Sequence, residues 1–239
     1  MKTKKVNLLL TIIFLFMSVF YVGATSKSSI EEEWESRTWE IGSFSTLHLE
    51  GGFKVFLIQG EENSLEVKTS DAKAFDYLNV TNKDGILHLH VDRKPFDFSR
   101  VTLYLTFREM ERMEIEGGIT LRTRGYMNMD DFFIKVEGGS KIDLKAKARN
   151  IGIKTEGGVL VELNGVAESL NVKLEGAGHV DAGALKCKDV RFNIQGVGTG
   201  KVHATNTLEA RIAGAGKIRY RGNPRVTEDI EGLGSIRKE

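Results

Sequence analysis

The fold is decided by the stretch FFIKVEGGSKIDL at residues 132–144. Apolar residues occupy alternate positions before the glycine pair, and the alternation resumes after it. Alternation of this kind is typical of half-buried strands, and a glycine pair between two such runs indicates a tight turn. The unit is therefore a strand, a glycine turn, a second strand and a second turn.

The same unit recurs throughout residues 111–239. Its glycine turns begin at Glu116, Glu137, Glu156, Glu175, Gln195, Ala213 and Glu231, with spacings of 21, 19, 19, 20, 18 and 18 residues. So constant a period is typical of repeat architectures, in which each repeat is one supersecondary unit. One further copy, Glu50-Gly51-Gly52, stands alone in the N-terminal region.

The repeats are too short for helices, because strands of five or six residues and their turns use up the whole period. One repeat cannot bury its apolar side alone, whereas stacked repeats can. We therefore predict an all-β fold, a right-handed parallel β-helix or solenoid with glycine-punctuated coils of about 19 residues, preceded by a strand-rich N-terminal section. The glycines are expected to supply positive φ or close backbone approach at the corners.

Stacking also predicts columns of outward side chains. One column contains Lys135, Lys154, Lys173, Asn193, Arg211 and Asp229, and the next contains Glu137, Glu156, Glu175, Gln195, Ala213 and Glu231. Neighbouring columns of opposite charge offset the repulsion within each column. This regular face is typical of a scaffold.

The chain divides into four segments. Residues 1–24 are predicted to be a signal peptide, because lysines precede the apolar run 6–16 and small residues suit cleavage after Ala24; a signal anchor is the alternative, since apolar residues continue to Val22. Residues 25–43 are a polar leader, expected to become ordered only near Phe44. Residues 44–110 form the N-terminal β section and residues 111–239 the repeats.

The N-terminal β section shows the same period-two alternation. Strands are expected around Leu47, Val55, Leu65, Ile86 and Val101. Turn-forming residues separate them at 59–63, at 82–85 and around Pro95.

Composition and charge restrict the possible partners. Removing the three signal lysines from 34 basic residues leaves 31 against 33 acidic ones, so the processed chain carries a net charge near −2 and nucleic acid is not an expected partner. No cysteine lies near the cleavage site, which disfavours a lipid anchor. Cys187 is the only cysteine, so an internal disulfide is excluded, and we expect it to be a buried, small apolar residue.

Several motifs together resemble the putative auto-transporter adhesin head GIN domain family of exported proteins, common in Gram-negative bacteria. They are Phe44-Ser45-Thr46-Leu47, Glu50-Gly51-Gly52-Phe53-Lys54-Val55, Ile58-Gln59-Gly60, Asp84-Gly85-Ile86-Leu87, the glycine repeats, Tyr220-Arg221-Gly222-Asn223-Pro224 and Gly234-Ser235-Ile236. The resemblance runs from Phe44 to Lys238 and implies a β-helical exported domain without catalytic residues. The chain uses Glu-Gly-Gly in its early repeats where the family has Ser-Gly-Ser-Gly-Asp.

Three kinds of site were weighed, and none is predicted. Calcium is disfavoured because the acidic positions Asp143, Glu162 and Asp181 recur at 19 residues and not at nine, and the column continues with His203, Arg219 and Arg237. His88 and His90 share a strand face at metal-site spacing, but the sequence indicates no third ligand nearby. His48, His179 and His203 are scattered, so no catalytic triad is indicated. We predict no catalytic, cofactor or metal residue.

The sequence favours a non-catalytic, exported binding or structural module of the cell envelope, in the periplasm or on the surface of a Gram-negative bacterium, with adhesion as one role. A surface glycan or an envelope protein is the expected partner, and the solenoid ends offer a route to a homo-oligomer. The alternatives are a polysaccharide lyase or hydrolase and a self-assembling scaffold. Only the insertion Gly198-Thr199-Gly200 and the loop 221–225 break the repeat, and any site is expected there.

Overall fold

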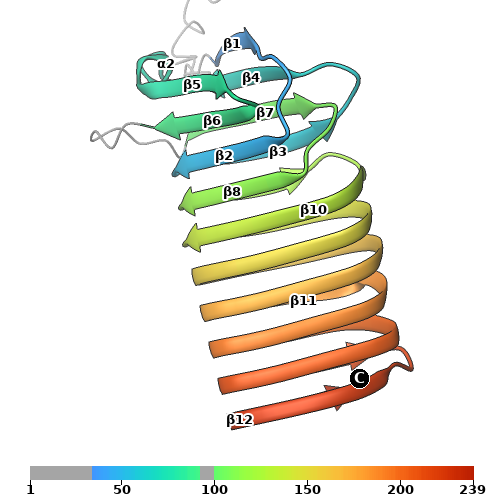
Figure 1. Ribbon diagram of the computed structural model, residues 1–239. Coiled ribbons are helices and arrows are strands. Elements are labelled where there is room, and N and C mark those ends of the chain that lie inside the picture. The colour runs from blue at the N-terminus through green and yellow to red at the C-terminus, as the bar shows by residue number, and fades with distance from the viewer. Residues whose placement is uncertain (1–33, 92–99) are drawn as a thin grey trace, which may run out of the picture. The chain divides into compact units, whose positions relative to one another are not determined.

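The computed structural model describes residues 34–91 and 100–239 (Figure 1). Strands account for 81% of these residues and helix for 3%, which confirms the all-β prediction. One mostly parallel, unclosed sheet has the order β1-β4-β7-β3-β9-β11-β10-β8-β2-β6-β5, and β12 pairs with β11. The predicted signal peptide and the turn around Pro95 lie outside the described residues.

The elements follow the chain in a simple order. They are β1 (Glu35–Glu40), β2 (Thr46–Gly51), β3 (Lys54–Gln59), β4 (Ser64–Thr69), α2 (Ala74–Tyr77), β5 (Leu78–Lys83), β6 (Ile86–Val91), β7 (Val101–Phe107), β8 (Arg112–Gly117), β9 (Thr120–Thr123), β10 (Met127–Gly138), β11 (Lys141–Arg221) and β12 (Arg225–Lys238). Strand β11 spans 81 residues and includes the glycine corners at Gly157, Gly176, Gly196 and Gly214. No helix in the described part of the chain is long and apolar enough to cross a membrane.

Successive repeats pair in parallel and in the register that the glycine alignment predicts. Glu137 of β10 lies opposite Glu116 of β8 on one side and Glu156 of β11 on the other. At the C-terminal end, Gly214 lies opposite Gly232. The isolated copy belongs to the same column, because β2 pairs with β8 and Gly51 lies opposite Gly117. Figure 1 shows these passes of the chain lying side by side.

Glycine is required at the corner for two reasons that act together. Gly117 has φ 105°, a conformation that side chains of L-residues rarely adopt. A Cβ atom on Gly117 would also lie 2.3 Å from the carbonyl oxygen of Gly51 in the neighbouring strand. Both expected roles of the corner glycines are therefore confirmed. The column with positive φ contains Gly51, Gly117, Gly138, Gly157, Gly176, Gly196, Gly214 and Gly232.

The core consists of the inward residues of the alternating strands. Leu49 and Val136, which directly precede their glycine turns, are fully buried, and the same holds for the equivalent positions Leu174 and Ile194 of later repeats, which are at most 1% exposed. The buried polar residues among those described are Thr69, Ser140 and Thr155. The Ser140 hydroxyl donates a 2.9 Å hydrogen bond to the Gly117 carbonyl oxygen and accepts one from the Ile119 N–H. Since its polar atom is satisfied, Ser140 fits a largely apolar core.

The leader is ordered earlier than predicted. Strand β1 begins at Glu35 and pairs antiparallel with β4, with Trp39 opposite Leu65. The Trp39 ring lies 6.1 Å from that of Phe75, and the Arg37 guanidinium lies 4.5 Å from the Phe75 ring centroid. These aromatic and cation–π contacts anchor a strand whose other residues are largely exposed.

The Asp84-Gly85 turn is confirmed as a two-residue hairpin. Asp84 and Gly85 have φ 53° and 78°, and they join β5 to β6 in an antiparallel pair. Positive φ at both central residues is the requirement of a type I′ turn, whose backbone twist matches the right-handed twist of the two strands that it joins. Strand β5 and the short helix α2 were not anticipated.

Candidate functional site

The outward face of the repeats carries the predicted ladder of opposite charges. Lys154 Nζ lies 2.6 Å from Glu156 Oε1 in its own repeat and 3.2 Å from Glu175 Oε2 in the next. Lys135 pairs with Glu137, and Lys173 pairs with Glu175. The hydrogen bond from Lys135 is the main cause that lowers the pKa of Glu137. These charges are already compensated, so this part of the face resembles a scaffold more than a binding site.

The acidic column that contains Asp181 carries an ion pair with a lysine. Lys201 Nζ lies 3.0 Å from Asp181 Oδ2. Burial raises the pKa of Asp181, but the hydrogen bond from the Gly183 N–H and the ion pair with Lys201 outweigh it, so the pKa lies below its ordinary value. Asp181, a carboxylate of this column, is therefore already paired with a lysine.

The two predicted breaks of the repeat hold local contacts. At the insertion, the Thr199 hydroxyl forms a hydrogen bond with His179 Nδ1. At the loop 221–225, Arg221 Nε lies 2.6 Å from Glu239 Oε2. Neither break lines the groove described next.

A groove of about 960 Å³ lies where β8, β10 and the start of β11 meet the end of β3. Its lining contains Thr46, Gln59, Glu109, Met110, Glu111, Arg112, Asn128, Met129, Asp130, Asp131, Phe132, Phe133, Lys147, Arg149, Asn150 and Gly152. On one side of the groove, the Gln59 side chain joins the end of β3 to β10. Its amide accepts a 2.7 Å hydrogen bond from Asn128 N and donates one to Asn128 O. Sequence reasoning missed this groove, although the 21-residue spacing from Glu116 to Glu137, the longest in the series, marks the same repeat.

Fixed charges and an aromatic ring define the chemistry of this groove. Asp131 accepts hydrogen bonds of 2.6 Å from Asn150 Nδ2 and 2.9 Å from Arg149 Nη2. These bonds, the one from Asn150 first, lower the pKa of Asp131, which is therefore a carboxylate at neutral pH. The half-buried Phe133 ring lies against Gly152, where a Cβ would approach within 2.8 Å of it, and the Arg112 guanidinium lies 4.7 Å from its centroid.

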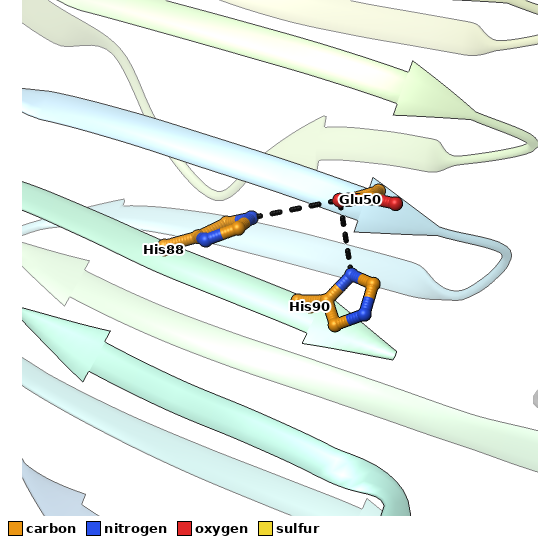
Figure 2. Close-up of side chains that lie close together, drawn as sticks. All are labelled: Glu50, His88 and His90. Carbon is orange, nitrogen blue, oxygen red and sulfur yellow. Dashed lines mark ion pairs between the residues drawn. The ribbon is translucent and has the colours of Figure 1, made fainter. Parts of the chain in front are cut away.

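A second cluster lies on the outward face of β2 and β6, beyond the Lys–Glu ladder. The two strands are parallel and in register, so Glu50 lies opposite His90 and His48 lies opposite His88. Glu50 Oε2 is 3.0 Å from His90 Nδ1 and 3.8 Å from His88 Nε2. Figure 2 shows both imidazoles directed toward the Glu50 carboxylate. The sequence placed His88 and His90 on one face and indicated no third ligand; the structure supplies Glu50.

His48 completes the surroundings of His88. Its ring is stacked on that of His88, with centroids 4.5 Å apart and an interplanar angle of 17°. His48 Nε2 lies 3.2 Å from Glu116 Oε1, which fixes the ring from the other side. Burial lowers the pKa of His88, and the imidazoles of His48 and His90 lower it further.

Short repeats with glycine corners, joined in one mostly parallel sheet, define an all-β repeat protein. Comparison with known families agrees with this class. The chain belongs to the family described as putative auto-transporter adhesin, head GIN domain, whose model matches residues 43–224. The resemblance drawn from the motifs is thereby confirmed. No curated protein matches the sequence.

Solved structures share the fold. A putative adhesin from Bacteroides fragilis is 20% identical, with a TM-score of 0.76, and the match covers 87% of this chain and 97% of that one. A putative lipid binding protein from Parabacteroides distasonis is 20% identical over the same shares, with a TM-score of 0.62. A putative adhesin from that organism is 19% identical, again over 87% and 97%, with a TM-score of 0.58. At these identities the likeness establishes the fold alone.

Proposed function

We propose that this protein is an exported, non-catalytic binding module of the cell envelope that takes a surface glycan in the groove beside β10. We further propose that its repeats form a right-handed β-solenoid, which carries the groove outside the cytoplasm once residues 1–24 are removed. The parallel pairing of residues one repeat apart supports the solenoid. Membership in an adhesin-like family supports the exported, adhesion-related role.

The polar groove is the single observation that carries the proposal. Arg149, Asp131 and Asn150 are held by mutual hydrogen bonds, so their remaining donors and acceptors are fixed in direction. A ligand rich in hydroxyl groups matches such a set, and the half-buried Phe133 ring, covered by the Arg112 guanidinium, adds apolar surface to the lining. The polar lining does not match an acyl chain, so the lipid named for one structural neighbour is not carried over to this groove.

The surroundings of Asp131 do not fit the acid catalyst of polysaccharide cleavage. Glycoside hydrolysis requires one carboxyl group that stays protonated until it acts as the general acid, which needs a raised pKa. The pKa of Asp131 is lowered, and its oxygens are engaged by Arg149 and Asn150. Asp131 is therefore a recognition group and not an acid catalyst.

A glycan array probed with the labelled protein, combined with a degradation assay on every bound polysaccharide, tests the proposal. We expect binding without turnover. Arg149→Ala should weaken the binding about tenfold, since hydrogen bonds to a charged group contribute about 1.5–3 kcal/mol and 1.4 kcal/mol is tenfold in affinity.

Arg191→Ala is the matched control. Arg191 also pairs with an acidic residue 18 positions away, with Nη2 2.8 Å from Glu209 Oε2, and it is similarly exposed but lies outside the groove lining. Its loss should leave glycan binding unchanged. Turnover of a bound glycan, or equal losses in the two variants, would contradict the proposal.

A further inference from the structure

We propose that Glu50, His88 and His90 form a binding site for a divalent ion of the zinc type. Their ligand atoms all lie within 4.8 Å of one another, and no other set of three or more such residues is this close in the part of the chain that the structure describes. The site is separate from the groove, and this inference does not depend on the ligand proposed there.

The backbone brings the three side chains together without any loop. His88 and His90 lie on one face of β6 because they are two residues apart on one strand. That face is the outward one, since Leu87 and Leu89 on the opposite face are fully buried. Glu50 reaches the same position from β2 because parallel pairing places it directly opposite His90. A site carried on two hydrogen-bonded strands is held more firmly than one carried on loops.

The distances suit closure around one ion. Glu50 Oε2 already lies 3.0 Å from His90 Nδ1 and 3.8 Å from His88 Nε2 (Figure 2). Tetrahedral zinc with bonds of about 2.0–2.2 Å places its ligand atoms about 3.4 Å apart, so only small side-chain rotations are needed. Three protein ligands leave the fourth position to solvent or to an exogenous group.

The Nε2 atom of His88 is buried without a hydrogen bond to the described residues. The His88 Nε2 is shielded from solvent and has no hydrogen-bond partner among the described residues, since the Glu50 oxygen at 3.8 Å is too distant. A bound cation would give this nitrogen a partner. The stacked ring of His48, fixed by Glu116, positions the His88 ring and does not itself act as a ligand.

The ligand types select the class of ion. Imidazole suits zinc, copper and nickel, whereas calcium and magnesium take oxygen ligands alone. Because the ion would join β6 to β2, its binding should stabilise the folded N-terminal section.

The direct test is titration of the untagged protein with Zn²⁺ in a calorimeter, together with the visible absorption of Co²⁺ and its displacement by Zn²⁺. We expect one equivalent of metal, Co²⁺ absorption of the kind that imidazole ligands produce, and a melting temperature that rises with Zn²⁺. The absence of saturable binding at one equivalent would overturn the proposal.

Single substitutions identify the ligands. His88→Gln, His90→Gln and Glu50→Gln should each weaken Zn²⁺ binding by at least about tenfold, since even outer-shell changes cost 10–100-fold. His179→Gln is the matched control, because it removes one partly exposed histidine from another part of the sheet. Circular dichroism checks that each variant is folded. A folded His88→Gln/His90→Gln variant that retains wild-type affinity would show that the metal binds elsewhere.

Discussion

Two adjacent glycines at one corner are under different constraints. Gly138 has φ 104°, and a Cβ on it would lie 2.8 Å from the Gly117 carbonyl oxygen. Gly139 has no atom within 4 Å of the same position. The glycine pair in the sequence therefore combines one residue that the fold requires with one that it tolerates.

Substitution of each glycine by alanine tests this difference. Gly138→Ala should lower the free energy of unfolding by about 1–3 kcal/mol. Alanine would have to adopt a positive φ, and the neighbouring backbone would have to move away from its Cβ. Gly139→Ala should change it by less than about 0.5 kcal/mol. Urea denaturation of both variants measures the difference, and equal losses would show that the corner is not tightly packed.

Cys187 gives a prediction about pH. Burial raises the pKa of its thiol to about 12, and the side chain is 1% exposed, as expected of a small apolar residue. Because the folded pKa lies above the ordinary value of about 8.5, the associated stability is complete below about pH 8.5 and is lost as pH rises toward the folded pKa. Thiol reagents should label Cys187 only after unfolding at neutral pH; rapid labelling of the native protein would contradict its burial.

The candidate metal site shows what sequence can and cannot predict at the residue scale. His88 and His90 share a face by strand periodicity alone. Glu50 joins them only because β2 pairs with β6, and strand order is not encoded in any local pattern. Groove residues such as Gln59 and Asn128 were missed for the same reason, since they meet across distant strands.

At the scale of the element, the Lys–Glu ladder makes stability depend on pH and salt. The hydrogen bond from Lys173 is the main cause that lowers the pKa of Glu175, although burial opposes it. A lowered folded pKa means that the contribution is present above the ordinary glutamate value of about 4.3 and is lost as pH falls through the folded value.

Glu175→Gln should therefore reduce the loss of stability between about pH 4.3 and lower pH, with only a small effect at pH 7 that salt diminishes further. Glu62→Gln, in the turn after β3, is the control and should leave the acid profile unchanged. Thermal denaturation across a pH series provides the measurement. Identical profiles for wild type and Glu175→Gln would mean that the ladder pairs contribute nothing.

Most strands were predictable because their inward residues alternate. Strand β7, for example, buries every second residue from Val101 to Phe107. Strand β1 was not predictable, because Trp39 is the only partly buried residue in it and no alternation is visible. The position of β1 is set by its pairing with β4. The ion pair of Lys201 with Asp181 was also missed, because the two residues lie 20 positions apart on either side of the insertion.

At the scale of the whole molecule, the final strand has less support than those inside the stack. Strand β10 pairs with β8 on one side and β11 on the other, whereas β12 pairs only with β11 among the described strands. Most residues of β12 are exposed, including Leu233 at 81%. A strand with one neighbour and few buried side chains opens more readily.

Hydrogen exchange followed by mass spectrometry should show faster exchange in β12 than in β10. The measurement belongs at several protein concentrations, because pairing of the open edge with another copy would protect β12 as concentration rises. Equal protection of β12 and β10 in dilute protein would contradict the expected gradient of stability.

Because the repeats share the same glycine corner, the number of repeats sets the length of the sheet. Every repeat meets its neighbours through equivalent corner atoms and outward columns, so an in-frame duplication of one repeat recreates the contacts that it interrupts. Each copy gained or lost C-terminal to the groove changes the sheet by one strand spacing, ~4.8 Å, and leaves the groove lining and the histidine cluster in place. Gain or loss of a repeat would thus change the length of the sheet in discrete steps.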